Sequence, residues 1–195
     1  MTPPKRSAPA SVYQLKITLV GLRPPIWRRV LATSDTKLSK LHDIIQRVMP
    51  WGNAHLHEFT VGGRRYSPEA TRYSDPEFGL EETKSEYRVS LGEVATAEKA
   101  RLTYLYDFGD GWDHGILVEK ILPVEEGKRY PVCVGGKRAC PPDDCGGTWG
   151  YVDFLEAIQD PQHPEHQTFV EWIGGSWDPE EFDLEAVNEV LTRIR

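Results

Sequence analysis

The alternation of apolar and polar residues predicts two strands near the N-terminus. Residues 12–22, VYQLKITLVGL, place apolar side chains at every second position, which is typical of a strand with one buried face. The segment Arg23-Pro24-Pro25 interrupts the pattern, and residues 26–32, IWRRVLA, resume it. We expect the two strands to pair as an antiparallel hairpin.

The apolar spacing then changes to that of a helix. Ser34, Asp35 and Thr36 precede the change and offer side chains that can cap a helix, and Pro50 follows it. The residues at helical spacing are Leu38, Leu41, Ile44, Ile45, Val48 and Met49. The pattern therefore predicts one amphipathic helix between these limits.

The middle of the chain is predicted to be mostly strand and loop. Residues 55–67, HLHEFTVGGRRYS, suggest a strand, a Gly-Gly turn and a short strand. Residues 68–86 are acidic and poor in apolar side chains, as in a mobile surface loop. A strand is expected near 87–91. Residues 123–149 are rich in Gly, Pro and Cys and have little periodicity, and so long an irregular loop needs a function or a constraint.

The last part of the chain is predicted to be helical. Apolar faces recur at 151–158, 169–173 and 184–194, and Asp183 is placed to cap the last helix. Strands are concentrated early and helices late, which predicts an α+β fold with a mostly antiparallel sheet. A hairpin followed by a helix and more strands also suggests a β-grasp-like roll. We expect a disordered lead-in over 1–11, then a single α+β domain over 12–195 with C-terminal helices from about residue 150.

Composition and charge narrow the classes of function. The chain has 195 residues and a net charge of −7, which is the wrong sign for a protein that binds nucleic acid by displacing counterions. Arg23, Arg28 and Arg29 are the one basic cluster, and they suit either a local nucleic-acid patch or a solvated edge strand. The sequence has no apolar run long enough for a membrane span and no signal peptide, so we expect a cytoplasmic protein.

The stretch YLYDFGDGWDHGI, residues 104–116, places four titratable side chains at a predicted hairpin turn. If Asp110-Gly111 forms a two-residue loop, counting outward puts Asp107 directly opposite His114. Opposed side chains lie about 5 Å apart, which allows a carboxylate–imidazole hydrogen bond. The pair then either closes the hairpin or belongs to a site.

His55 and His57 favour the second interpretation. Two residues apart on a strand, they project to the same face and could bind one metal ion with Asp107 and His114. A metal-dependent hydrolase or nuclease would then use Glu58, Asp110 or Asp113 as its base. Strand alternation points Glu58 away from the two histidines.

The three cysteines, Cys133, Cys140 and Cys145, offer another metal site. They occur in CVGGKRACPPDDCGG, an odd number of thiols with no Cys-x2-Cys pair. Three thiolates with His114 or His57 would complete a tetrahedral zinc site. The alternative is three buried free cysteines in a loop stiffened by prolines. We expect the loop to be ordered against the hairpin, with Cys133 or Cys140 near His114.

Several motifs, taken in order, identify a family. They are IWRRV, LSKLHDIIQRVMPW, HLHEFTVGG, YLYDFGDGWDHGILVEKIL and ACPPDDCGGTWGY. The chain closely resembles the plasmid Ri open-reading-frame-three-like family over about nine-tenths of its length. The resemblance implies a compact α+β domain without established catalytic residues. Many members have Val at the position of Cys145, which leaves Cys133 and Cys140 as the better metal pair.

Some members of that family carry a resolvase-type name as passengers of an insertion element. The sequence has no Ser or Tyr nucleophile accompanied by the arginine cluster that a recombinase needs. We therefore expect a cytoplasmic interaction or ligand-binding domain associated with mobile elements, with zinc as a candidate cofactor and an unidentified protein or small molecule as partner. A metal-dependent hydrolase or nuclease is the alternative.

Overall fold

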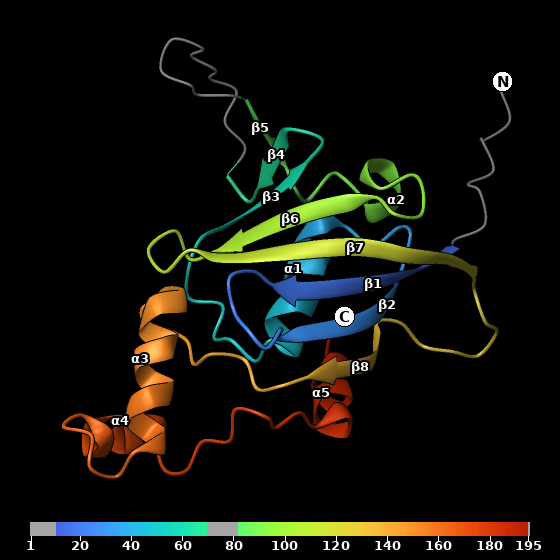
Figure 1. Ribbon diagram of the computed structural model, residues 1–195. Coiled ribbons are helices and arrows are strands. Elements are labelled where there is room, and N and C mark those ends of the chain that lie inside the picture. The colour runs from blue at the N-terminus through green and yellow to red at the C-terminus, as the bar shows by residue number, and fades with distance from the viewer. Residues whose placement is uncertain (1–10, 70–81, 195) are drawn as a thin grey trace, which may run out of the picture.

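The computed structural model describes residues 11–69 and 82–194 of the chain. Residues 1–10, which make up most of the expected lead-in, and residues 70–81 of the expected acidic loop lie outside this range. The described residues form an α+β fold built on one sheet of eight strands in the order β5-β4-β3-β6-β7-β1-β2-β8 (Figure 1). The strands are β1 (Ser11–Leu19), β2 (Trp27–Thr33), β3 (His57–Val61), β4 (Arg64–Ser67), β5 (Thr83–Ser85), β6 (Arg101–Tyr106), β7 (Trp112–Pro123) and β8 (Val132–Lys137).

The sheet is open and mostly antiparallel. Strands β4 and β5 pair in parallel at one edge, while β1 pairs antiparallel with both β2 and β7 in the centre. The hairpin and helix that suggested a β-grasp-like roll are both present. The hairpin is β1 and β2, which belong to this open sheet, and the helix is α1, which follows them. The predicted fold class is therefore confirmed.

Helices cover one face and one end of the sheet. They are α1 (Leu38–Val48), α2 (Leu91–Val94), α3 (Gly147–Gln159), α4 (His166–Ile173) and α5 (Leu184–Leu191). Helix α1 lies behind the central strands in Figure 1, α5 lies beside β8, and α3 and α4 form a separate helical pair near the β6–β7 turn. Asp183 caps α5 as predicted, because its carboxylate accepts hydrogen bonds from the N–H groups of Glu185 and Ala186.

Helix α1 fills the core with the apolar stripe that predicted it. Leu41, Ile44 and Val48 are fully buried, and burial of each such side chain stabilises the fold by about 1.5–3 kcal/mol. The predicted capping by residues 34–36 is wrong: Lys37 is the N-cap residue and no side chain caps the helix. The N–H of Leu38 instead donates to the carbonyl of Val89.

Three predicted loop or strand segments differ in the structure. Residues 83–85 are strand β5 rather than loop. The predicted strand at 87–91 is instead the end of a turn, an isolated bridge at Ser90 and the first residue of α2. Strand β8 lies inside the segment 123–149 that looked irregular. Its sequence, VCVGGK, has two glycines that mask its strand character, and it forms by pairing with the edge of β2.

The β6–β7 hairpin is present, but its predicted register is wrong. Tyr104, not Asp107, faces His114, and the connection spans residues 107–111. Asp107 leaves the strand with φ of 55°, and its carboxylate accepts a hydrogen bond from the N–H of Gly109 at 2.8 Å. This local turn at Asp107 replaces the two-residue Asp110-Gly111 loop.

Candidate functional site

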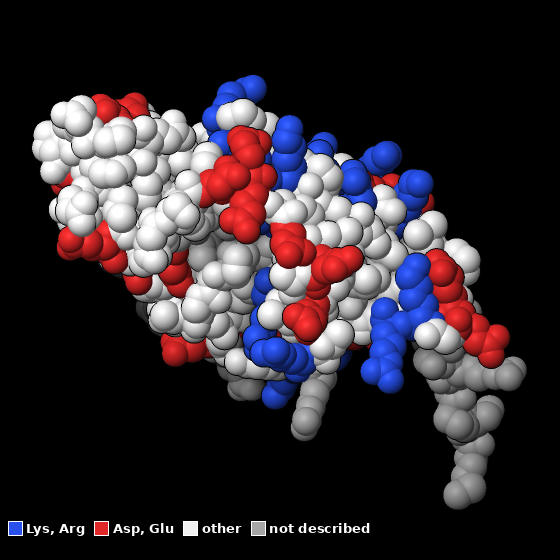
Figure 2. Space-filling model, turned by 90° about the horizontal axis from the view of Figure 1, so that it is seen from below, with Lys and Arg blue, Asp and Glu red and all other residues white. Residues whose placement is uncertain are grey.

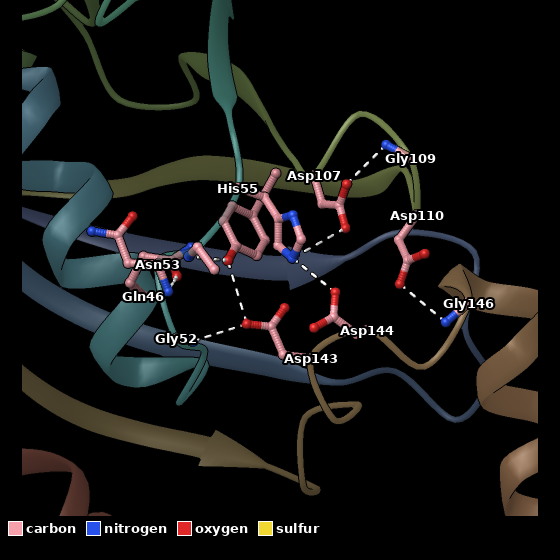
Figure 3. Close-up of polar contacts among 12 residues, drawn as sticks. Gln46, Gly52, Asn53, His55, Asp107, Gly109, Asp110, Asp143, Asp144 and Gly146 are labelled. Atoms are coloured by element: carbon pink, nitrogen blue, oxygen red, sulfur yellow. Dashed lines mark hydrogen bonds and ion pairs between the residues drawn. The ribbon is translucent and has the colours of Figure 1, made fainter.

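Three segments far apart in the sequence meet beside the end of strand β6 (Figure 3). They are the loop 50–56 after α1, the β6–β7 turn 107–111, and the loop 138–146 before α3. The ring of Trp51 stacks on Tyr106, and its indole N–H donates to the carbonyl of Pro141 at 2.9 Å. The N–H of Asp107 donates to the carbonyl of Leu56, also at 2.9 Å. Each segment is thus fixed to another.

Each of the three segments contains a residue with a left-handed backbone. Asn53, Asp107 and Asp144 have φ of 55°, 55° and 60°. Asn and Asp adopt this conformation more readily than other side chains with a Cβ, but it still costs free energy. Such conformations persist where the surrounding structure imposes them, and they are common at binding sites.

The segments bring together one imidazole and three carboxylates, which we call the His55 cluster: His55, Asp107, Asp143 and Asp144. His55 Nε2 lies 2.8 Å from Asp144 Oδ1 and 3.7 Å from Asp107 Oδ2. Asp143 Oδ2 accepts hydrogen bonds from the N–H of Gly52 at 3.0 Å and from Tyr106 Oη at 3.4 Å. One ligand atom from each of His55, Asp143 and Asp144 lies within 4.8 Å of the others.

One oxygen of the His55 cluster, Asp143 Oδ1, is buried without a hydrogen-bond partner among the described residues. His55 Nε2 is also buried, and its closest partner is Asp144 Oδ1 in the ion pair at 2.8 Å. Buried polar atoms are normally satisfied, and Asp143 Oδ1 has no such partner among these protein atoms. A cation would interact favourably with this oxygen and with the neighbouring carboxylates.

The carboxylates also set the charge of the cluster. Partial burial acts to lower the pKa of His55, but the neighbouring Asp107, Asp144 and Asp143 outweigh it and raise that pKa. The side chain of Asp144 is 68% exposed and that of His55 is 29% exposed. The cluster is therefore accessible from solvent and carries an excess of negative charge.

His114 lies outside this cluster. It is fully buried, and its Nδ1 donates to the backbone carbonyls of Trp112 and Tyr104. Burial lowers the pKa of His114 to about 4, which the two backbone hydrogen bonds only partly oppose. The predicted Asp107–His114 pair does not form, because the turn at Asp107 shifts the register.

His57 is also directed to a different place from His55. Its Nε2 lies 2.9 Å from Glu86 Oε2, both side chains are buried, and its ring stacks on His42. His55 precedes β3 and does not share its alternation, because the strand begins only at His57. Both histidines line one pocket of about 370 Å³, but they contact different acidic partners.

The three residues considered as the base of a hydrolase, Asp110, Asp113 and Glu58, lie in three different places. Asp110 Oδ2 accepts a hydrogen bond from the N–H of Gly146, which ties the hairpin turn to the loop before α3. Asp113 is exposed on β7, between the buried Trp112 and His114. Glu58 lies 3.6 Å from Arg65, away from the His55 cluster as strand alternation predicted.

The structure orders the cysteine loop but does not gather the cysteines around a histidine. Within 11–69 and 82–194, the one group of three potential metal-ligand side chains is His55, Asp143 and Asp144. Cys133 lies on β8, and Cys140 Sγ contacts Met49 Sδ at 3.0 Å. Burial raises the pKa of Cys140 to about 11. Burial, together with the negative charges of Asp110, Asp143 and Asp144, raises the pKa of Cys145 to about 12.

The three arginines do not form one basic surface. Arg28 is 2% exposed, and Arg29 makes two hydrogen bonds to Glu119 at 2.6 and 2.9 Å. Burial of Arg28 follows from strand alternation, because it faces α1 while Arg29 faces solvent. Figure 2, seen from below, shows Lys and Arg next to Asp and Glu over part of this face and only Asp and Glu at its left end.

Asp143 and Asp144 were not among the residues singled out from the sequence. The cysteines of CPPDDCGG drew the metal hypothesis, whereas the two aspartates between them supply the clustered ligand atoms. Two adjacent carboxylates in a proline- and glycine-bounded loop were the available signal. Their proximity to His55 depends on how the loop docks on Trp51 and Tyr106, which no local pattern predicts.

Comparison with known proteins places the chain among relatives without a described activity. A family model described as "Plasmid pRiA4b ORF-3-like protein" matches residues 11–186. The uncharacterized protein y4hQ of Sinorhizobium fredii is 38% identical over 186 residues, covering 92% of this chain and 87% of that protein. The crystal structure of the protein of unknown function MM3350 from Methanosarcina mazei Go1 has a TM-score of 0.79 and 36% identity, covering 92% of this chain and 97% of that one. None of the helices in the described part of the chain has the length and apolar character to cross a membrane.

Proposed function

Since the chain belongs to the plasmid pRiA4b ORF-3-like family, whose relatives above have no described activity, we propose from its own geometry that it is a ligand-binding domain with a divalent metal site at the His55 cluster. The observation that carries this proposal is the group of His55, Asp143 and Asp144, in which Asp143 Oδ1 is buried without a hydrogen-bond partner. It is the one group in the described residues whose ligand atoms are close enough for a single ion.

The ligand types favour particular metals. One imidazole nitrogen with two or three carboxylate oxygens suits zinc or manganese, whereas magnesium prefers oxygen ligands with several retained waters. His55 would supply the nitrogen, Asp143 and Asp144 the oxygens, and Asp107 a fourth ligand or a hydrogen bond to bound water. Only the neutral imidazole of His55 can bind a metal, and its pKa is raised by the neighbouring carboxylates, so metal affinity should fall as the pH is lowered.

Isothermal titration with ZnCl2 and MnCl2 tests the proposal on protein made without a histidine tag and stripped with chelator. We expect one ion per chain, and Asp144→Asn and His55→Ala should each weaken binding at least about tenfold. His163→Ala is the matched control, because His163 lies in the loop before α4, away from the cluster. Absence of binding, or equal binding by His55→Ala, would refute the proposal.

A metal-dependent hydrolase is the second candidate function. Its support is Asp107, whose Oδ2 lies 3.7 Å from His55 Nε2 and could remove a proton from a metal-bound water. The exposure of Asp144 leaves room for a substrate beside the ion. Hydrolysis of bis-p-nitrophenyl phosphate by the manganese-loaded protein, lost in Asp107→Asn with metal binding retained, would establish this activity.

The cellular setting is a proposal of a different kind. The description of the family refers to a plasmid, which supports an association with mobile elements and hence a role inside the cell. Pull-down of partners by wild-type protein and by Asp144→Asn, compared in a cell extract, would show whether an interaction depends on the metal site.

A further inference from the structure

A second pocket lies at the C-terminal end of α1, between that end, the loop after β8 and α5. Its volume is about 320 Å³, within the range of small-molecule sites. The walls are mostly apolar and include Pro50, Trp177, Phe182, Val187 and Val190. Two arginines, Arg28 and Arg47, also line it.

Arg28 is a buried charge without an anionic partner in the described part of the chain. Its guanidinium donates to the carbonyls of Val48 at 2.8 Å, Trp27 at 2.9 Å and Lys137 at 3.1 Å. The remaining nitrogen, Nη2, has the sulfur of Cys140 at 3.6 Å as its partner. Carbonyl oxygens and a thiol satisfy hydrogen bonds but do not neutralise the charge, and buried charges are normally paired.

The surrounding residues hold Arg28 at the pocket. The ring of Phe182 lies over the guanidinium at 4.5 Å from its carbon to the ring centroid. Gly136 makes this stacking possible, because a Cβ there would collide with both the Phe182 ring and the Arg28 side chain. The absence of a side chain at Gly136 on β8 thus lets Arg28 pack against the aromatic wall of the pocket.

Arg47 adds a second cationic group. It is exposed in the last turn of α1 and makes no hydrogen bond or ion pair with the residues that the structure describes. Two carboxylates also line the pocket, those of Glu181 and Asp183. The carboxylate of Asp183 is engaged in capping α5, and neither lies within ion-pair distance of Arg28 or Arg47.

We propose that this pocket binds a small carboxylate with an apolar body, whose carboxylate pairs with Arg28 and Arg47 and whose hydrocarbon packs against Phe182, Val187 and Val190. An anion supplies the counter-charge that Arg28 lacks, and the apolar walls favour a hydrophobic body over a polar one such as phosphate. The site is separate from the His55 cluster, so the proposal does not depend on metal binding.

Titration calorimetry of the full chain with octanoate, octan-1-ol and inorganic phosphate tests the two parts of the ligand separately. We expect octanoate to bind one molecule per chain, and the other two to bind at least about tenfold more weakly. Equal affinity for octan-1-ol would overturn the role of the arginines, and equal affinity for phosphate would overturn that of the apolar walls. No binding of octanoate would overturn the whole proposal.

Variants locate the site without touching the buried Arg28, whose removal would disturb folding. Ala186→Phe fills the pocket from an exposed position on α5 and should abolish octanoate binding, and Arg47→Gln should weaken it at least about fivefold. Arg29→Gln removes a neighbouring arginine that pairs with Glu119 outside the pocket, and it should leave the affinity unchanged. Octanoate binding that survives Ala186→Phe in a folded protein would contradict the assignment.

Discussion

The rings of His42 and His57 stack face to face, with their centroids 3.5 Å apart and their planes 4° from parallel. Both nitrogens of His42 are in hydrogen-bond contact, Nδ1 with Tyr104 Oη and Nε2 with Asn53 Oδ1, each at 2.7 Å. Burial lowers the pKa of His42 to about 4, and the charge of His57 contributes to that shift. The stacked pair therefore requires a neutral His42.

Acid should destabilise the protein through this histidine and through His114. Each has an ordinary pKa of 6.5 and a folded-state pKa of about 4. The unfolded chain binds these protons first as pH falls below 6.5, so stability is lost between that pH and about 4. Once the pH is below both pKa values, the free energy of unfolding has fallen by on the order of 3 kcal/mol for each histidine. His55 acts in the opposite direction, but its exposure makes its contribution smaller.

Urea unfolding at about pH 7.5 and about pH 4.5 measures this effect. The free energy of unfolding should fall by at least about 2 kcal/mol, with a smaller fall in a folded His42→Phe variant. Glu119 adds little to this fall, because its ordinary pKa is 4.5 and Arg29 holds its folded-state pKa at about 2, so its contribution to stability is lost mainly below pH 4.5. Equal stability at the two pH values would show that these histidines are not kept neutral by the fold.

Gly147 packs closely against Asp110 of the hairpin turn, at the point where the loop 138–146 meets α3. Its φ is 69°, and a Cβ at this position would collide with the backbone carbonyl of Asp110. Gly147→Ala should lower the free energy of unfolding by about 3 kcal/mol through strain and displacement, and should weaken zinc binding because the loop carries Asp143 and Asp144. Urea titration and calorimetry measure the two effects.

Gly127→Ala is the matched control for that variant. Its φ is 78°, but a Cβ would meet no atom within 4 Å. It should cost only the backbone strain of about 1 kcal/mol and should leave zinc affinity unchanged. If the two alanine variants behave alike, close packing of Gly147 against Asp110 has no part in holding the site.

Duplex DNA should bind weakly. The chain carries a net charge of −7, Arg28 is buried, and Arg29 is paired with Glu119. Fluorescence anisotropy at about 0.15 M salt should give no dissociation constant tighter than about 100 μM. Sub-micromolar affinity that disappears on charge reversal at Arg23 and Arg29 would contradict this expectation.

The spacing of apolar and capping residues along the sequence was sufficient to predict the strands and helices that have strong periodicity. The stripe of α1, the alternation of β1 and the capping Asp183 each depend on residues close in sequence. Strand β8 could not be predicted in this way, because VCVGGK becomes a strand only by pairing with β2 across about a hundred residues. Non-local pairing of this kind overrides a weak local preference.

The candidate site was only half predictable for a related reason. His55 and Asp107 were identified, but their expected partner His114 was wrong because one residue, Asp107, adopts positive φ and changes the register. Their actual neighbours, Asp143 and Asp144, arrive through the docking of a loop on Trp51 and Tyr106. Neither a backbone conformation at one turn residue nor a loop's docking place follows from hydrophobic periodicity.

X-ray absorption spectroscopy of the zinc-loaded protein tests the His55 cluster most directly, because it identifies the atoms bound to the metal. We expect a first shell of nitrogen and oxygen at about 2.0–2.2 Å, with the outer-shell scattering of one imidazole, and loss of that scattering in His55→Ala. A sulfur shell at about 2.3 Å would place zinc on Cys133, Cys140 or Cys145 instead. That result would contradict a metal site formed by His55, Asp143 and Asp144.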